Sequence, residues 1–205
     1  MNKVIIKTAI VTVLSLIVAS ILAGIGIYAF APRFAGDCCY ELGLKNMATS
    51  CYERVYQKTG TYDDLIELVN SAIYAEDDKN VSVYGEELVN RKIEFNAFCE
   101  QADFDKEFEE GSFTTYDYYV NTTVFAKYYL GYKQDAVDFA FSCVFKGGYV
   151  ENSALKMLVE MVDSEEGLGN MLVIAYNALE PANRYAFTNH NVFRSDMKEL
   201  GYTLS

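Results

Sequence analysis

The chain has 205 residues, of which 51% are hydrophobic and 22% charged, and its formal net charge at pH 7 is −12. This composition excludes a disordered or low-complexity chain and predicts a packed core. Residues 1–33 carry three cations and no acid, so the total of −12 leaves −15 on residues 34–205. Such a surface repels phosphate, which excludes nucleic acid as a partner and favours cations, basic protein patches or neutral surfaces; a role in keeping the domain soluble is the alternative explanation of the charge.

The first predicted element is an apolar helix. From Thr8 to Phe30 the sequence holds 23 residues without a charge, about 35 Å of helix against a hydrocarbon core of ~30 Å. Its Ile, Leu, Val and Phe side chains favour insertion by about 4 to 7 kcal/mol. We therefore expect a single transmembrane helix over about residues 8–30. The chain would then consist of a tail and anchor over 1–33 and an acidic helical domain over 34–205.

A cleaved signal peptide is the alternative interpretation of this stretch. Two lysines precede it, and Ala29-Phe30-Ala31 matches an A-x-A cleavage site. The apolar run is longer than a signal-peptide core, however, and Pro32 would become the first mature residue, where its ring should hinder the peptidase. Retention predicts a single-pass protein of the cell membrane, with its N-terminus inside and the acidic domain outside the cytoplasm.

Small residues recur at four-residue spacing within this predicted membrane helix. They are Ser15, Ala19 and Ala23, with Ser20 and Gly24 beside them. Because small side chains allow helices to approach closely in lipid, the pattern predicts self-association through the transmembrane helix. The ordinary composition of membrane helices accounts for it equally well.

An amphipathic helix is predicted next, over residues 62–73, because its apolar side chains recur at intervals of three and four. The apolar face consists of Tyr62, Leu65, Ile66, Val69, Ala72 and Ile73, and the polar face of Asp63, Asp64, Glu67, Asn70 and Ser71. Gly60 ends the preceding helix, and Thr61 with Asp64 resembles a capping box. The two helices are therefore expected to form a hairpin.

A second strong helical pattern begins at Thr114, is capped by Asp117 and ends at Gly131. With the segment Ala136–Phe145 it should form the most buried part of the domain, because both are apolar nearly all round. Further helices are predicted at about 82–102, 152–162, 168–179 and 191–200. Strand signals are weak. The expected fold class is all-α, a transmembrane helix followed by an array of helical hairpins, either an α-solenoid or an irregular bundle.

Two of the predicted turns resemble those of tetratricopeptide-type repeats. Residues 56–65 read Tyr-Gln-Lys-Thr-Gly-Thr-Tyr-Asp-Asp-Leu, which places glycine, tyrosine and an acidic pair between two helices. The run Leu130–Ala136, Leu-Gly-Tyr-Lys-Gln-Asp-Ala, is similar. The resemblance covers about 42–76 and 116–146.

The spacing of these two turns also fits repeats of this family. Gly60 and Gly131 are 71 residues apart, about two periods of 34, although Phe95 occupies the place where a middle glycine would fall. The resemblance implies a solenoid whose concave face binds a peptide or protein.

Five cysteines, an odd number, leave at least one thiol that cannot pair within the chain. They are Cys38, Cys39, Cys51, Cys99 and Cys143. If Cys39 and Cys51 lie on one helix they are about 18 Å apart, well beyond the ~7 Å Cα separation that a disulfide spans. We expect mostly buried, reduced thiols, and without a C-x-x-C pair no zinc site is predicted.

No catalytic, cofactor-binding or metal-binding residue is predicted. His190 is the single histidine and lies in a polar stretch typical of a loop or helix start. Residues 103–111 are rich in carboxylates, but Lys106 and Phe108 do not fit a calcium loop, which favours an acidic linker between helices. No phosphate-binding or dinucleotide-binding motif is present.

A cluster of tyrosines on one helical hairpin is the candidate partner-binding surface. It consists of Tyr116, Tyr118, Tyr119, Tyr128, Tyr129 and Tyr132. Rigid amphipathic rings suit protein-binding grooves. Core packing, with the hydroxyls at the rim, is the alternative interpretation.

These observations favour a membrane-anchored helical-repeat module that binds a protein partner, as an accessory subunit of an envelope assembly. One alternative is an envelope enzyme with a carboxylate-based site, which predicts a deep polar pocket holding convergent carboxylates of raised pKa. Another is a cation- or ligand-binding sensor that calcium stabilises against heat.

Overall fold

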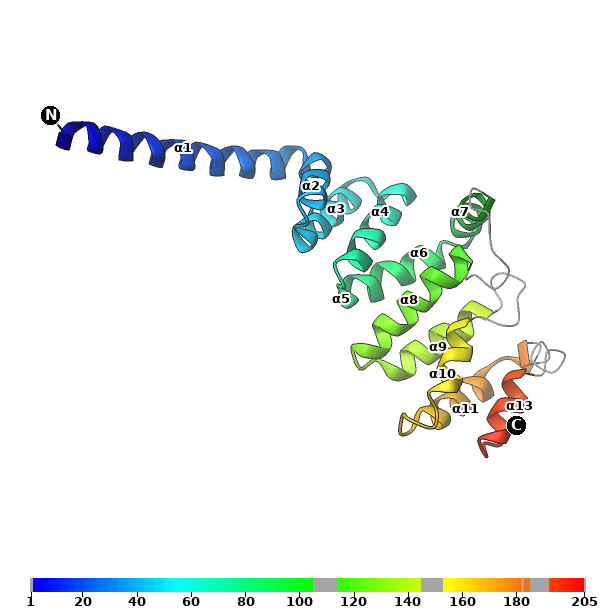
Figure 1. Ribbon diagram of the computed structural model, residues 1–205. Coiled ribbons are helices and arrows are strands. Elements are labelled where there is room, and N and C mark those ends of the chain that lie inside the picture. Colours follow the sequence, from blue (N-terminus) through cyan, green and yellow to red (C-terminus); the bar gives the residue numbers. More distant parts are fainter. Residues whose placement is uncertain (1, 105–113, 145–152, 182, 185–191, 205) are drawn as a thin grey trace. The chain divides into compact units, whose positions relative to one another are not determined.

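The computed structural model describes residues 2–104, 114–144, 153–181, 183–184 and 192–204 (Figure 1). The secondary structure of these residues is helical, with no β-strand among them, which confirms the all-α part of the predicted fold class. The chain forms two compact units, Met1–Ala75 (unit 1) and Glu76–Ser205 (unit 2). The predicted division after residue 33 stays a prediction.

Unit 1 contains α1 (Asn2–Phe30), α2 (Pro32–Glu41), α3 (Lys45–Thr59) and α4 (Tyr62–Tyr74). The helix breaks at Ala31 because the residue before a proline avoids helical backbone, whereas Pro32 suits the first turn of a new helix. Gly43 follows α2 and Gly60 follows α3, both in the left-handed conformation. As a result α2, α3 and α4 pack as consecutive hairpins.

The predicted helix over 62–73 is confirmed as α4, and its predicted cap is present. The Asp64 backbone N–H donates to the Thr61 hydroxyl at 3.3 Å. The predicted polar face is wrong at two positions, because Asp64 and Ser71 are buried. Their partners come from elsewhere in unit 1: the Ser71 and Thr49 hydroxyls of α4 and α3 are hydrogen-bonded at 3.0 Å.

The prediction of a transmembrane helix over residues 8–30 is wrong. Residues Asn2–Phe30 are helical, but within the part of the chain that the structure describes no helix is long and apolar enough to cross a membrane. Single-pass membrane localisation, integral membrane contact and self-association through this helix are overturned with it.

Unit 2 contains α5 (Asp78–Asn80), a π-helical turn η1 (Val81–Gly85), α6 (Glu86–Asn90), α7 (Lys92–Phe104), α8 (Thr115–Tyr129), α9 (Lys133–Val144), α10 (Ser153–Glu160), α11 (Leu168–Ala178) and α13 (Val192–Glu199). The predicted helices after residue 113 are confirmed. Thr114 and Asp117 form a reciprocal capping box at the start of α8.

Helix α8 lies at the centre of unit 2, where it packs against η1, α9 and α10. Val120, Thr123 and Val124 are fully buried in it, as are Ala136, Val137 and Ala140 in α9. The prediction that these two helices are deeply buried is therefore confirmed.

The predicted single helix over 82–102 is wrong, because the chain leaves helical backbone at Arg91, where ψ is 64°. The π-helical turn before it sets Gly85 directly against α8. A Cβ at Gly85 would lie 2.3 Å from the Thr123 hydroxyl, so this contact requires glycine. After the break, α7 packs against the first turns of α8, with Phe95 and Tyr116 ring centroids 5.4 Å apart.

Candidate functional site: the α8–α9 turn

The structure does not bring the six candidate tyrosines together on one surface. Tyr118, Tyr129 and Tyr132 are 49%, 70% and 60% exposed, whereas Tyr119 and Tyr128 are buried and Tyr116 is half-buried. Tyr118 and Tyr129 are also separated by about 16 Å along α8. Only Tyr129 and Tyr132 share an exposed position, at the turn between α8 and α9.

The inward-facing tyrosines hold the helices of unit 2 together. The Tyr116 hydroxyl donates to the Cys143 carbonyl of α9 at 2.6 Å, and burial raises the pKa of this phenol. The Tyr119 ring packs edge-on against Phe95 and Phe98 of α7, at centroid distances of 6.2 and 5.7 Å. For these residues the core-packing interpretation is the correct one.

The turn that carries Tyr129 and Tyr132 is fixed by its backbone. The Gly131 N–H donates to the Tyr128 carbonyl and the Tyr132 N–H to the Lys127 carbonyl, each at 3.0 Å. This pair of bonds is a Schellman motif, and it requires the left-handed backbone that Gly131 adopts at φ 89°. Tyr129, Leu130 and Tyr132 are therefore exposed on a turn with little freedom to rearrange.

A buried lysine lies directly behind this turn. Lys127 Nζ donates to Glu86 Oε2 of α6 at 2.6 Å and to Asp135 Oδ2 of α9 at 2.7 Å. Burial alone would lower the pKa of Lys127, but the hydrogen bonds to Asp135 and Glu86 outweigh burial and raise it. The amine is thus charged and joins three segments of unit 2.

The sequence contains a signal for the role of Lys127. Lys127 lies on the same helical face as Val120 and Val124, both fully buried, so a cation there must find carboxylates. The identity of those carboxylates could not be read from the sequence.

A second ion pair flanks the turn. Lys133 Nζ, in the first turn of α9, lies 2.7 Å from Glu165 Oε2 and 4.9 Å from the centre of the Tyr128 ring. The hydrogen bond from Lys133 lowers the pKa of Glu165. The cations Lys127 and Lys133 face three carboxylates around the turn, of which the Asp135 side chain is 60% exposed. One negative charge is left over beside the exposed aromatic residues.

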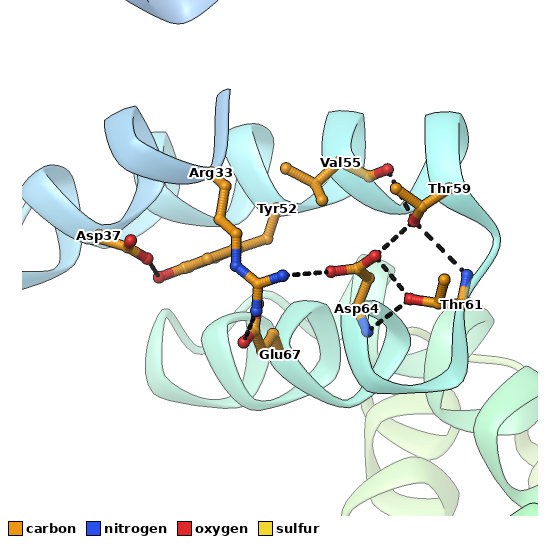
Figure 2. A network of polar contacts seen from close by, with 8 residues as sticks. All are labelled: Arg33, Asp37, Tyr52, Val55, Thr59, Thr61, Asp64 and Glu67. Atoms are coloured by element: carbon orange, nitrogen blue, oxygen red, sulfur yellow. Dashed lines mark hydrogen bonds and ion pairs between the residues drawn. The ribbon is translucent and has the colours of Figure 1, made fainter. Parts of the chain in front are cut away.

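Unit 1 contains a polar network of a different kind, shown in Figure 2. Asp64 Oδ1 accepts from Arg33 Nη1 at 3.0 Å, and Asp64 Oδ2 accepts from the hydroxyls of Thr59 and Thr61 at 2.5 and 2.6 Å. Burial raises the pKa of Asp64, but these hydroxyls and the Arg33 charge outweigh it and lower the pKa. Arg33 also pairs with Glu67, so the network joins α2 to the α3–α4 hairpin.

A hollow of about 510 Å³ in unit 2 has carboxylates among the residues that line it. Asp138 of α9 and Glu180, after α11, line it together with Lys92 around Phe141 and Ala175. The hypothesis of a carboxylate-based enzyme site stays a prediction.

The remaining chemical candidates lie partly outside the described residues. His190 and most of the acidic stretch 103–111 are among the residues that the structure does not describe. Within the described ranges, no three His, Cys, Asp or Glu side chains come together to hold a metal ion.

Comparison with protein families, with curated proteins and with solved structures finds no match. The tetratricopeptide-type assignment therefore stays a prediction, although both segments that carry it are helical hairpins with a left-handed glycine at or beside the turn. The function is inferred from the geometry of the site alone.

Proposed function

We propose that this protein is an interaction module that binds a basic segment of a partner protein at the α8–α9 turn. The observation that carries the proposal is the exposure of Tyr129 and Tyr132, at 70% and 60%, on a turn fixed by a Schellman motif. Leu130, 39% exposed between them, extends the apolar part of the patch.

Exposed tyrosines on a rigid turn favour binding for two reasons. Tyrosine buries a large area at low entropic cost and is enriched among residues that dominate binding energy. A turn that is already ordered loses little further freedom when a partner binds. The Schellman bonds and the buried Lys127 behind them supply that order.

The charge around the turn favours a basic partner. The chain carries −12 overall, and three carboxylates face two lysines at the turn itself. The Asp135 side chain is the most exposed of these carboxylates, so it remains open to a lysine or arginine of a partner. Charge complementarity of this kind speeds association and weakens as salt screens it.

The proposal is tested by site-specific cross-linking in the full chain within its own cells. A photo-reactive phenylalanine analogue replaces Tyr132 in one variant and Tyr118 in a control, since Tyr118 is also exposed but lies at the far end of α8. We expect a discrete adduct with one protein from position 132 and none from position 118.

Affinity for the purified adduct partner then provides the quantitative test. The variant Tyr129→Ala/Tyr132→Ala should bind at least about tenfold more weakly, because dominant interface tyrosines each contribute more than ~1 kcal/mol. Tyr118→Ala should bind as the unchanged chain does. Equal adducts from both positions, or unchanged affinity of the double variant, would overturn the proposal.

A further inference from the structure

Cys39 and Cys51 lie on different helices, Cys39 in α2 and Cys51 in α3. The premise that both occupy one helix, about 18 Å apart, therefore does not apply. A short turn reverses the chain between them: the Gly43 N–H donates to the Tyr40 carbonyl at 3.0 Å and the Leu44 N–H to the Cys39 carbonyl at 2.8 Å. Helix α3 thus runs back along α2.

The two helices approach closely at the level of Cys51. Gly36 is buried one turn before Cys39, and a Cβ added to Gly36 would lie 3.2 Å from the Cβ of Cys51. Residues three apart share a helix face, so Cys39 also faces α3. Cys39 lies near enough to Cys51 to add to the effect of burial, the larger cause, in raising the pKa of the Cys51 thiol.

The cysteines differ in how far a reagent can reach them. Cys51 is 1% exposed and Cys39 is half-buried, so Cys39 is the member of the pair that solvent reaches. Cys38 is exposed, and Cys99 and Cys143 are buried in unit 2. A disulfide requires neighbouring thiols on close backbones, and the Gly36–Cys51 contact brings the two backbones close one turn from Cys39.

From this geometry we infer that Cys39 and Cys51 form a reversible intrachain disulfide on reaction with a small-molecule disulfide such as oxidised glutathione. The site lies in unit 1 and is independent of the interaction proposed for the α8–α9 turn. It makes the α2–α3 hairpin a site of thiol modification.

The reaction proceeds by two exchanges. The Cys39 thiolate attacks one sulfur of the reagent, the reagent's S–S bond breaks, and one reagent thiol leaves. Cys51 then loses its proton to solvent and attacks Cys39 Sγ, which forms the intrachain S–S bond and releases the second reagent thiol, protonated from solvent. Two protein thiols are oxidised and one reagent disulfide is reduced to two thiols.

The second exchange has a distinctive pH dependence. Burial, reinforced by the neighbouring Cys39, raises the pKa of Cys51 to about 11. The attacking Cys51 thiolate therefore increases about tenfold with each unit of pH below that value. Release of the second reagent thiol should accelerate accordingly between about pH 7 and pH 9.

The experiment treats the full chain with oxidised glutathione, blocks the remaining thiols by alkylation and digests with trypsin. Cleavage at Lys45 places Cys38 and Cys39 in one peptide, 34–45, and Cys51 in another, 46–54. We expect a disulfide-linked pair of these peptides that a reducing agent separates.

Serine variants distinguish this bond from others. The linked pair should persist in Cys38→Ser and disappear in both Cys39→Ser and Cys51→Ser, each with an unchanged circular dichroism spectrum. Cys143→Ser, a buried cysteine in unit 2, serves as the matched control and should leave the pair intact. Alkylation of both peptides without a linked pair, or a linked pair that survives in Cys39→Ser, would overturn the inference.

Discussion

The α3–α4 turn of unit 1 and the α8–α9 turn of unit 2 share a backbone feature but differ in the direction that their side chains face. In each, a glycine with positive φ lies between two helices. At the first turn the neighbouring polar side chains face inward, where Asp64 collects Arg33, Thr59 and Thr61. At the second, aromatic side chains face outward while Lys127 is paired behind them. A similar turn thus holds helices together through buried polar contacts in unit 1 and exposes aromatic side chains to solvent in unit 2.

The largest effect is expected at the inward-facing turn. Asp64→Ala removes the acceptor of three side-chain hydrogen bonds, one of them charged, and leaves the threonine hydroxyls without it. We expect the free energy of unfolding of unit 1 to fall by about 3 kcal/mol, measured by urea denaturation. Asp63→Ala is the matched control, because the neighbouring Asp63 is exposed. Equal losses of unfolding free energy in the two variants would contradict a stabilising role of the Asp64 network.

The same network gives unit 1 a stability that depends on pH. Folding lowers the pKa of Asp64 below its ordinary value of 3.8. Its contribution is therefore present above about pH 4 and is lost as pH falls through the lower folded-state pKa. Asp64→Ala should show a weaker loss of stability in this acid range than the unchanged chain.

A smaller effect is expected at the outward-facing turn. Lys127→Met keeps the buried stem and removes the charge, and the carboxylates left behind, Glu86 and Asp135, are exposed enough to be hydrated. The cost should be about 1 to 2 kcal/mol in the free energy of unfolding of unit 2. The unpaired carboxylates should also increase the salt dependence of stability. A loss as large as that of Asp64→Ala would show that the two turns are built alike.

The smallest effect should be shared by both turns. Gly60→Ala and Gly131→Ala each force a side chain into left-handed backbone, with open space around the added methyl group. Each should lower the melting temperature by an amount equivalent to about 1 kcal/mol. Similar losses of stability would confirm that the need for glycine depends on the left-handed backbone and not on the side chains around each turn. A loss in only one of the two variants would contradict this.

Local signals in the sequence predict the helices and their ends well. Thr61 with Asp64 and Thr114 with Asp117 mark helix starts because a cap acts within three residues. The break at Arg91 was missed because it accompanies a contact between Gly85 and Thr123, 38 positions away. The burial of Asp64 was missed for the same reason, since Arg33 is 31 residues distant.

The candidate site could be predicted only in part. Two of the six tyrosines proposed from the sequence lie at the exposed turn, but their separation from the buried ones depends on which face of α8 the neighbouring helices cover. The cysteine pair was missed because the turn at Gly43, which separates α2 from α3, was not recognised.

The contact between Gly85 and Thr123 also constrains how this sequence can change over time. A methyl group at position 85 would overlap the Thr123 hydroxyl, which is buried and has no hydrogen-bond partner among the residues that the structure describes. Replacing Thr123 by alanine removes the obstructing hydroxyl, so an alanine at position 85 becomes easier to accommodate only after that change. Among descendants of this chain the two positions should therefore vary together, with the substitution in α8 arising first.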